Sequence, residues 1–428
     1  MLIVGVGIYL TIGTGFVQLR LFPKAVASFF CQLRGGSSQY RSLCTALAAT
    51  VGTGNMIGVA GAIVIGGPGA VFWMWICAFL GMAIKFAEAT LAVRYRSTVN
   101  GEPMGGPMYM IRNGLSTKWH WLATAYCILG IAASFGVGNA TQVNAFTMGV
   151  NGILGLFGIP GTGIGNLLIG LVLSVIVGFV LLGGGKRISD AAEKIVPIAA
   201  VAYILLCLIV LILRYEKILG AFYSIIAGAF APKSVTGGLI GSAFIALRTG
   251  AARGTFTNEA GMGTAAIAHA GADVSHPADQ GLMGIMEVFL DTILICTMTA
   301  LVILCSGIPI PYGGADTGVQ TAQAFSSALG TWSTVPFYLA ICAFAIATVF
   351  GWSLYGGRCA QYLFGQRAWK NYGLMQAVVV VLGAIVSLET AWIVSEIMNA
   401  LMAIPNLIAI MLLSPELFRL LRNYKTGA

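Results

Sequence analysis

The chain has 428 residues, of which 58% are hydrophobic and 9% are charged, and its formal net charge is +9. A soluble domain carries roughly 25% charged residues, so this composition excludes a soluble globular protein and predicts that much of the surface faces lipid. The basic residues form no run interleaved with aromatic residues, and the Cys and His residues are dispersed. These two observations argue against nucleic-acid binding and against a metal centre.

Continuous apolar runs of helix length predict an all-α integral membrane protein rather than a β-barrel, whose strands would alternate apolar and polar residues. A bilayer core about 30 Å thick needs about 20 apolar residues per helix. We therefore predict about eleven transmembrane helices, near residues 2–18, 43–65, 69–93, 119–150, 165–182, 196–213, 237–257, 281–308, 335–364, 373–388 and 392–413. The first run has no basic residue ahead of it, so we interpret it as a span rather than a signal peptide.

The basic residues are distributed unevenly between the two sets of alternate loops. One set holds most of the 23 Lys and Arg residues, whereas the other holds Arg214, Lys217 and Lys233. The positive-inside rule makes the first set cytoplasmic. It predicts an external N-terminus and a cytoplasmic C-terminus, and we expect the protein in a prokaryotic cell membrane.

Two of the predicted spans contain more Gly, Thr and Asn than a membrane helix usually does. They are residues 46–69 and residues 237–263, called here the first and second interrupted segments. A Gly in a helix interior costs about 1 kcal/mol, and an unwound backbone at membrane depth has to line a polar cavity. Close helix packing through Gly54, Gly58 and Ala62 remains an alternative for the first segment. Arg248, Arg253 and Glu259 favour a true interruption in the second segment, where Arg253 and Glu259 could pair.

The two interrupted segments occupy matching places if the first span is peripheral. The chain then divides into residues 1–42 with an extra helix and a loop, residues 43–214 with five helices, and residues 215–428 with five helices and a short tail. Broken helices at corresponding positions of two halves are typical of secondary transporters, and the break marks the binding site.

Several motifs resemble the alanine/glycine:cation symporter family. They are GTGN at 52–55, GGPGAVFWMW at 66–75, KFAEATLAVRYR at 85–96, RGTFTNEAGMGTAAIAHA at 253–270 and GWSLYGGR at 351–358. The resemblance implies a leucine-transporter-type fold of five plus five inverted repeats after one extra helix. It also implies sodium-coupled symport of alanine or glycine by alternating access. Thr257, Thr264 and Ala266 depart mildly from the usual family pattern, which leaves the fine substrate preference open.

By this resemblance the first interrupted segment supplies amides for the substrate carboxylate and oxygens for sodium. The substrate residues there are Thr53, Gly54 and Asn55, and the sodium residues are Thr50, Val51, Asn55 and, from a later span, Thr348. A hard cation prefers such oxygen ligands. For Asn55 a helix-capping role remains an alternative.

The resemblance also places part of the substrate site in the second interrupted segment. We predict an unwound stretch that ends at Asn258 and contains the substrate residues Gly254, Thr255, Phe256 and Thr257. Gln142, near Asn144 and GVGN at 136–139, is a further candidate, as is Trp352, which shares a helix face with Thr348. For Phe256 and Trp352 simple packing is the alternative, and for Gln142 it is a contact with a neighbouring helix.

The ionisable residues at membrane depth are Lys85, Glu88, Glu287 and Asp291. We interpret them as ion pairs or gating groups rather than ligand contacts. The leading hypothesis is a sodium-coupled symporter with Na+ as the coupling ion, no other cofactor and no obligatory protein partner. Its partners are membrane lipid and a small amino acid, L-alanine or glycine, with tolerance of D-alanine open.

Other functions are less consistent with the sequence. A proton-coupled carrier, or a carrier of another small solute, remains the alternative within transport, with Glu259 and Asp291 as candidate proton acceptors. A channel would need several copies around an axis. An intramembrane enzyme lacks support, because there is no HExxH or GxSxG motif and no nucleophile paired with a base.

Overall fold

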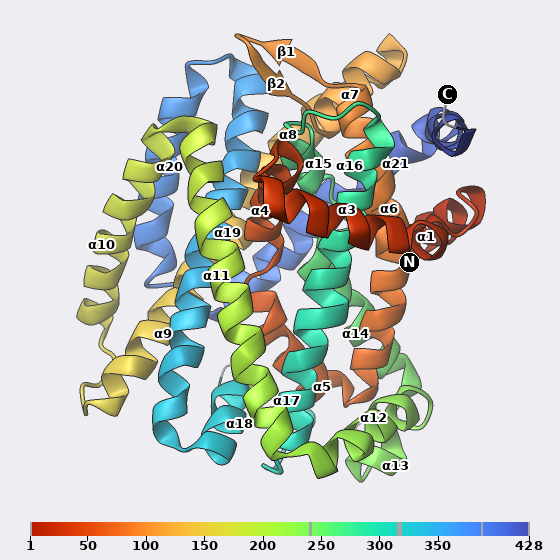
Figure 1. Cartoon of the computed structure of the whole chain (residues 1–428). Helices are drawn as coiled ribbons and strands as arrows, with labels where there is room; N and C mark the ends of the chain where they lie inside the picture. Colours follow the sequence, from red (N-terminus) through yellow and green to blue (C-terminus); the bar gives the residue numbers. More distant parts are fainter. Residues whose placement is uncertain (1, 239–241, 315–318, 387, 427–428) are drawn as a thin grey trace.

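The computed structural model describes residues 2–238, 242–314, 319–386 and 388–426. Among these residues the fold is helical except for one antiparallel hairpin, β1 (Ser97–Val99) and β2 (Glu102–Met104), in which Val99 is paired with Glu102. The long helices stand side by side, and the hairpin lies at one end of the bundle (Figure 1).

Within the described residues, seven helical stretches are long and apolar enough to cross a membrane. They are formed by α6 (Gly69–Arg94), α8 with η3 and α9 (Trp121–Phe135, Gly136–Ala140, Thr141–Leu156), α10 (Gly163–Leu182), α11 (Gly184–Leu213), α16 with η4 and α17 (Pro277–Val288, Phe289–Cys296, Thr297–Cys305), α19 (Thr334–Phe364) and α21 (Leu388–Thr426). Each corresponds to one of the predicted spans, so the all-α membrane class is confirmed.

The four other predicted spans correspond to shorter helices. Residues 2–18 contain α1 (Leu2–Gly13), which rises only about 18 Å. Residues 43–65 are divided between α4 (Ser38–Thr50) and α5 (Ile57–Gly66). The remaining two contain α14 (Ala243–Asn258) and α20 (Ala368–Gly383), each of 16 residues. The total of eleven spans and the division into five plus five therefore stay predictions.

Short helices cover the two ends of the bundle and connect the long ones. They are α2 (Val17–Arg20), α3 (Phe22–Gly35), α7 (Pro107–Gly114), η2 (Thr117–Trp119), α12 (Tyr215–Phe230), α13 (Pro232–Thr236), α15 (Thr264–His269), α18 (Gln320–Leu329) and η5 (Thr331–Ser333). In Figure 1, α7 and the hairpin lie at the top, whereas α12 and α13 lie at the bottom.

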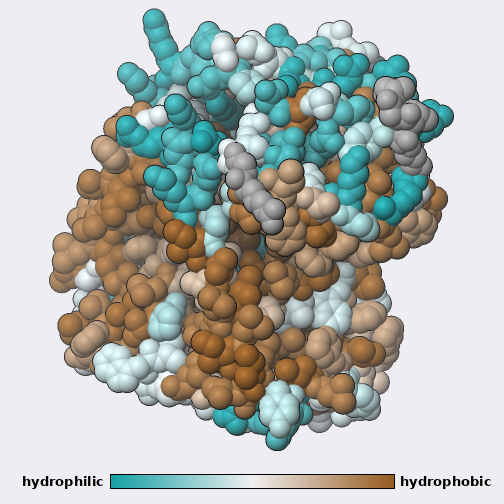
Figure 2. All heavy atoms as spheres, viewed as in Figure 1, coloured by the Kyte–Doolittle hydropathy of each residue, from teal (hydrophilic) through white to brown (hydrophobic). Residues whose placement is uncertain are grey.

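The molecular surface separates into a broad hydrophobic band and a hydrophilic cap at the end that carries the hairpin (Figure 2). Arg41, Lys186 and Arg358 line a cavity at this end together with Glu102 of the hairpin. We call it the basic end. A continuous apolar band below a charged cap is the surface expected of a protein embedded in lipid.

Helix α6 lies in the interior and packs closely against α14 and α16. Glycines allow this approach, because a Cβ added at Gly250 of α14 would lie 2.2 Å from the carbonyl oxygen of Ala70. A Cβ at Gly284 of α16 would lie 2.7 Å from the carbonyl oxygen of Lys85. Small residues at helix contacts are the usual way for membrane helices to pack. The position of α6 between two partners is important for the site described below.

Candidate functional site

The first interrupted segment is a broken helix, as predicted. Helix α4 ends at Thr50, a single 3-10 turn (Thr53–Asn55) follows, and α5 begins at Ile57. We call residues 51–56 the first break. The backbone N–H of Gly52 donates to Oδ1 of Asn55 at 2.9 Å. Asn55 therefore caps the break, and a capping role and a role at the site are compatible because the carbonyl oxygen has a second lone pair.

The second interrupted segment is broken too, but at a different position from the predicted one. Gly254, Thr255, Phe256, Thr257 and Asn258 form the last turn of α14 rather than an unwound stretch. The chain unwinds at residues 259–263, called here the second break, before α15 begins. Glu259, Gly261 and Gly263 have φ of +54°, +92° and +76°. A left-handed conformation suits glycine and ends a helix, whereas Gly254 is helical and faces α6.

Two predicted site residues from separate helices meet at the first break. The hydroxyl of Thr348 of α19 donates to the carbonyl oxygen of Phe344 in its own helix at 2.9 Å and lies 3.4 Å from the carbonyl oxygen of Val51. Oε1 of Gln142, from α9, accepts from the backbone N–H of Thr53 at 3.4 Å. A Cβ added at Gly52 would lie 2.7 Å from Oγ1 of Thr348 and 3.2 Å from Oε1 of Gln142. The structure thus brings the first break, Gln142 and Thr348 together.

The side-chain hydroxyl of Thr53 is buried without a hydrogen bond in the described part of the chain. A buried hydroxyl without a partner costs free energy, so such an atom at a helix break indicates a place for a bound molecule.

The opposite wall of this region comes from the end of α14 and from Trp352. A Cβ at Gly54 would lie 3.2 Å from Oγ1 of Thr257 and 3.5 Å from the ring of Phe256. Trp352 is buried on α19, one turn beyond Thr348, and its Nε1 donates to Oε1 of Glu259 at 2.7 Å. Helix α19 therefore contacts the first break through Thr348 and the second break through Trp352.

Some predicted residues lie elsewhere. Gly254 packs against Met74 of α6, and Thr255 and Phe256 both line a separate cavity beside Trp73 and Ile76 of the same helix. The amide of Asn144 donates to the carbonyl oxygen of Val386. The hydroxyl of Thr50 lies within donating distance of the carbonyl oxygen of Ala46 and of Glu287.

Glu287 and Asp291 are two of the residues for which we predicted ion pairing or gating. Lys85 and Glu287 form a fully buried ion pair at 2.8 Å, which confirms the structural role expected for them. Asp291, for which we expected the same role, instead accepts from Nδ2 of Asn55 at 2.6 Å. Its contact with a predicted site residue was missed, and its only sequence signal is a charge in the apolar stretch FLDTILIC. Arg253, which the sequence allowed to pair with Glu259, forms an ion pair with Glu396 at 3.0 Å.

Negative groups outnumber positive ones in the interior. Among the described residues Glu88, Glu259, Glu287 and Asp291 are at most 2% exposed, whereas Lys85 is the one buried lysine. Uncompensated charges are costly in a low-dielectric interior. The region accordingly favours bound protons or metal cations.

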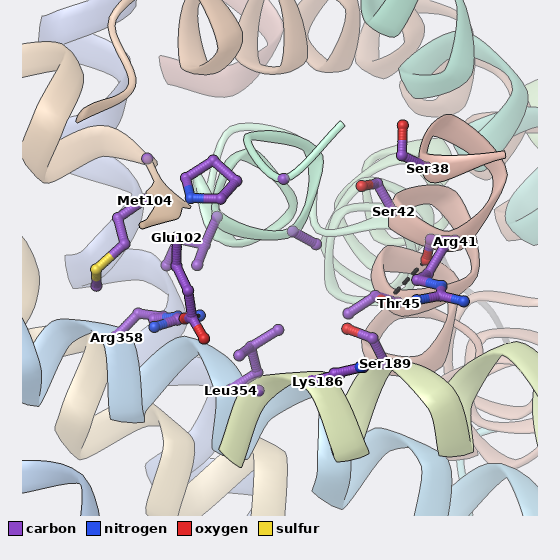
Figure 3. A pocket seen from close by; sticks show the side chains of 16 residues that line it. Ser38, Arg41, Ser42, Thr45, Glu102, Met104, Lys186, Ser189, Leu354 and Arg358 are labelled. Carbon is purple, nitrogen blue, oxygen red and sulfur yellow. Dashed lines mark hydrogen bonds and ion pairs between the residues drawn. The ribbon is translucent and has the colours of Figure 1, made fainter. Parts of the chain in front are cut away.

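A cavity of about 310 Å³ opens at the basic end (Figure 3). Ser42 and Thr45 of α4 line one side of it, and Leu354 and Arg358 of α19 line the other. Thr45 precedes Thr50 by five residues, which is about 7.5 Å along a helix. Arg358 pairs with Glu102 of the hairpin at 2.8 Å at the rim. The cavity is therefore a candidate passage toward the first break.

Two broken helices that meet in the interior of a membrane-spanning bundle define the class of multi-pass secondary transporters. The whole chain, residues 1–428, matches the model of the sodium:alanine symporter family, and the chain belongs to that family. The resemblance seen in the motifs is therefore confirmed, and the chain is a transport protein rather than an enzyme.

Three relatives show the range of the family. The chain is 41% identical to an uncharacterised transporter of Haemophilus influenzae, over 99% of this chain and 92% of that protein. It is also 41% identical to the sodium/alanine symporter AgcS of Methanococcus maripaludis, over 96% and 91%. The probable sodium/glutamine symporter GlnT of Bacillus subtilis is 35% identical, over 99% and 87%.

A solved structure shares the fold. The crystal structure of MhsT in complex with L-phenylalanine superposes with a TM-score of 0.64 at 17% identity, over 87% of this chain and 88% of that one. MhsT has the leucine-transporter-type fold, so the predicted fold type is supported at the level of overall architecture.

Proposed function

We propose that the protein is a sodium-coupled symporter of alanine and/or glycine that works by alternating access. One observation carries the proposal: Gln142 and Thr348 converge on the first break, where the buried hydroxyl of Thr53 has no partner among the described residues. Such a convergence of backbone and neutral side-chain oxygens suits a zwitterion and a hard cation.

The substrate would bind between the first break and the end of α14. Its carboxylate would accept from the Thr53 hydroxyl and from N–H groups near Gly54, in the 3-10 turn that precedes α5. Its ammonium would donate to carbonyls in the last turn of α14, such as that of Thr257, because the final carbonyls of a helix lack intrahelical partners. Phe256 and Trp352 would enclose a small side chain. Gly254 packs against α6 and Thr255 lines a separate cavity, so this arrangement does not use them.

Sodium would bind on the Thr348 side of the first break. The carbonyls of Thr50 and Val51, the hydroxyl of Thr348 and Oδ1 of Asn55 are neutral oxygens that a hard cation prefers. Asp291, bonded to Asn55, adds negative charge nearby. The excess of buried carboxylates supports coupling to a cation rather than transport of an uncharged solute alone.

The alternative is proton coupling within the same fold. Protons could neutralise Glu259 and Asp291 as a cation would, and a relative from Bacillus subtilis is named a putative sodium/proton-dependent alanine carrier protein. Sodium remains the preferred ion because the first break offers mainly neutral oxygens.

We propose the orientation of the protein in the membrane from its charge distribution. By the positive-inside rule the basic end faces the cytoplasm, so the N-terminus would be external and the cavity of Figure 3 would be a cytoplasmic exit. The three parts 1–42, 43–214 and 215–428 would then act as a peripheral segment and two five-helix halves.

Uptake by proteoliposomes tests the proposal. Labelled L-alanine is followed with an inward sodium gradient, and with choline in place of sodium at the same ionic strength and pH. We expect accumulation above equilibrium only with sodium. Equal uptake in both would remove sodium from the mechanism. Competition by glycine, D-alanine and glutamine then defines the substrate, and stronger competition by glutamine than by glycine would contradict the small pocket.

A further inference from the structure

Helix α6 carries two fully buried ionisable side chains, Lys85 and Glu88, that lie outside the proposed substrate and sodium contacts. They are three residues apart and share a helix face. Burying ionisable groups is costly unless each finds partners, so the partners show what these residues do.

Lys85 connects α6 to the first break through Glu287 of α16. Oε1 of Glu287 accepts from Nζ of Lys85 at 2.8 Å and from the hydroxyl of Thr50 at 2.8 Å. Thr50 is the last residue of α4, directly before the first break. Oε2 of Glu287 accepts from Nε2 of His269, the last residue of α15, at 2.9 Å.

Glu88 connects the same face of α6 to the second break. Its Oε1 accepts from the backbone N–H groups of Gly261 and Gly263, both at 3.0 Å, and from Nδ2 of Asn406 at 2.7 Å. Both glycines have a left-handed conformation, and their two N–H groups converge on one anion, much as in the backbone nests that bind anions elsewhere. Here the anion is a side chain of the protein.

We infer that Lys85 and Glu88 are positioning residues through which α6 couples the two breaks. The inference rests on the proposed symport function. A movement of α4 that separates Thr50 from Glu287 removes one hydrogen-bond donor from the Glu287 carboxylate, to which Lys85 also donates. One helix turn away on α6, Glu88 accepts hydrogen bonds from the second break. The contact of Gly284 with the Lys85 carbonyl leaves α16 no room to move closer to α6. Binding of sodium at the first break and binding of substrate against α14 thus affect each other through α6.

The test measures how strongly sodium lowers the KM for alanine, which is a coupling between two ligands. Thr50→Val removes the hydroxyl that contacts Glu287 but retains the backbone carbonyl proposed for sodium. Losing this bond to a charged group should reduce the ratio of KM at limiting sodium to KM at saturating sodium about ten-fold. Thr50→Ser retains the hydroxyl and should preserve the ratio.

A matched control and a second arm complete the experiment. Thr147→Val removes a buried hydroxyl that bonds only the Asn144 carbonyl of its own helix, and it should keep the wild-type ratio. At the second break Glu88→Gln keeps an acceptor oxygen and should preserve most of the coupling, whereas Glu88→Leu should lose it. If Glu88→Leu fails to fold, the comparison of Thr50→Val with Thr50→Ser still tests the coupling.

The outcomes separate this inference from the proposed function. If the wild type has a sodium-dependent alanine KM and Thr50→Val has the same ratio of KM at limiting to saturating sodium, the coupling through α6 is overturned. The symport proposal is then unaffected. A wild type whose alanine KM is independent of sodium would overturn the symport proposal, and this inference with it.

Discussion

The two breaks differ in how their backbone groups are satisfied. At the second break the N–H groups of Gly261 and Gly263 already bind the Glu88 carboxylate. At the first break the protein supplies one cap from Asn55 and leaves the Thr53 hydroxyl buried without a partner among the described residues. Side-chain atoms without a partner among them also lie at the second break, namely Oε2 of Glu88, Nδ2 of Asn258 and Oδ1 of Asn406. A helix break is therefore not in itself a binding site. Backbone groups that a side chain fills, as Glu88 fills those of Gly261 and Gly263, form a structural joint and are not left for a ligand.

The largest effect, a loss of stability, should come from removing the Glu88 carboxylate from the second break. Glu88→Leu leaves two backbone N–H groups and the Asn406 amide buried without their acceptor, which should cost about 3 kcal/mol of stability. Thermal unfolding of the purified protein in detergent measures it. Glu88→Gln, which retains an acceptor oxygen, is the control. An unchanged melting temperature in Glu88→Leu would mean that the carboxylate does not hold the break.

A somewhat smaller effect is expected at the first break. Asn55→Ala removes the Gly52 cap and the partner of Asp291, and sodium-driven alanine uptake should fall about a hundred-fold. Uptake is compared at equal amounts of inserted protein. Asn144→Ala removes an amide of the same kind outside both breaks and should transport normally. Normal uptake by Asn55→Ala would refute the site.

The contrast between the breaks is sharpest for Thr53. Because its hydroxyl has no partner, Thr53→Val should leave the melting temperature unchanged while it weakens alanine binding about ten-fold. Alanine binding by isothermal titration and unfolding of the same samples give both quantities. Thr53→Ser should bind as the wild type does. A loss of stability without a loss of binding would assign Thr53 to packing.

The smallest effect concerns the link between the breaks on α19. Trp352→Phe keeps an aromatic wall but removes the Nε1 donor to Glu259, so alanine affinity should fall about five-fold. Competition by larger amino acids should rise in parallel, because the ring is no longer fixed. Trp369→Phe, at an indole that donates to the Leu181 carbonyl away from both breaks, serves as the control. Unchanged selectivity would show that Trp352 only packs.

Much of the fold could be predicted because its cause is local. Runs such as 69–93 and 196–213 are apolar enough that only a membrane helix fits them, and the structure places α6 and α11 there. The shorter helices α14 and α20 were less predictable in length, because their ends depend on neighbours rather than on composition. The first break was predictable since several glycines, threonines and an asparagine interrupt an apolar run within a few residues.

The candidate site was predictable in part from the resemblance to the symporter family. Gln142, Thr348 and the first break were expected together and lie together, whereas Gly254 and Thr255 were expected at a break and lie in a helix. Glycine serves both close packing and left-handed turns, and a sequence pattern does not separate these uses. The close approach of α6 shows that Gly250 and Gly254 serve helix packing. The positive φ angles of Gly261 and Gly263 show that these two residues form a turn.

The sequence by itself determined that this protein lies in a membrane, that two of its helices are interrupted and that it resembles symporters of small amino acids. Those properties follow from composition, helix length and contiguous motifs. Tertiary structure alone decided that Lys85 pairs with Glu287, that Glu88 fills the second break and that Asp291 contacts Asn55. The partners in these contacts are far apart along the chain. Their meeting depends on how α6 packs against α14 and α16, and no local pattern encodes that packing.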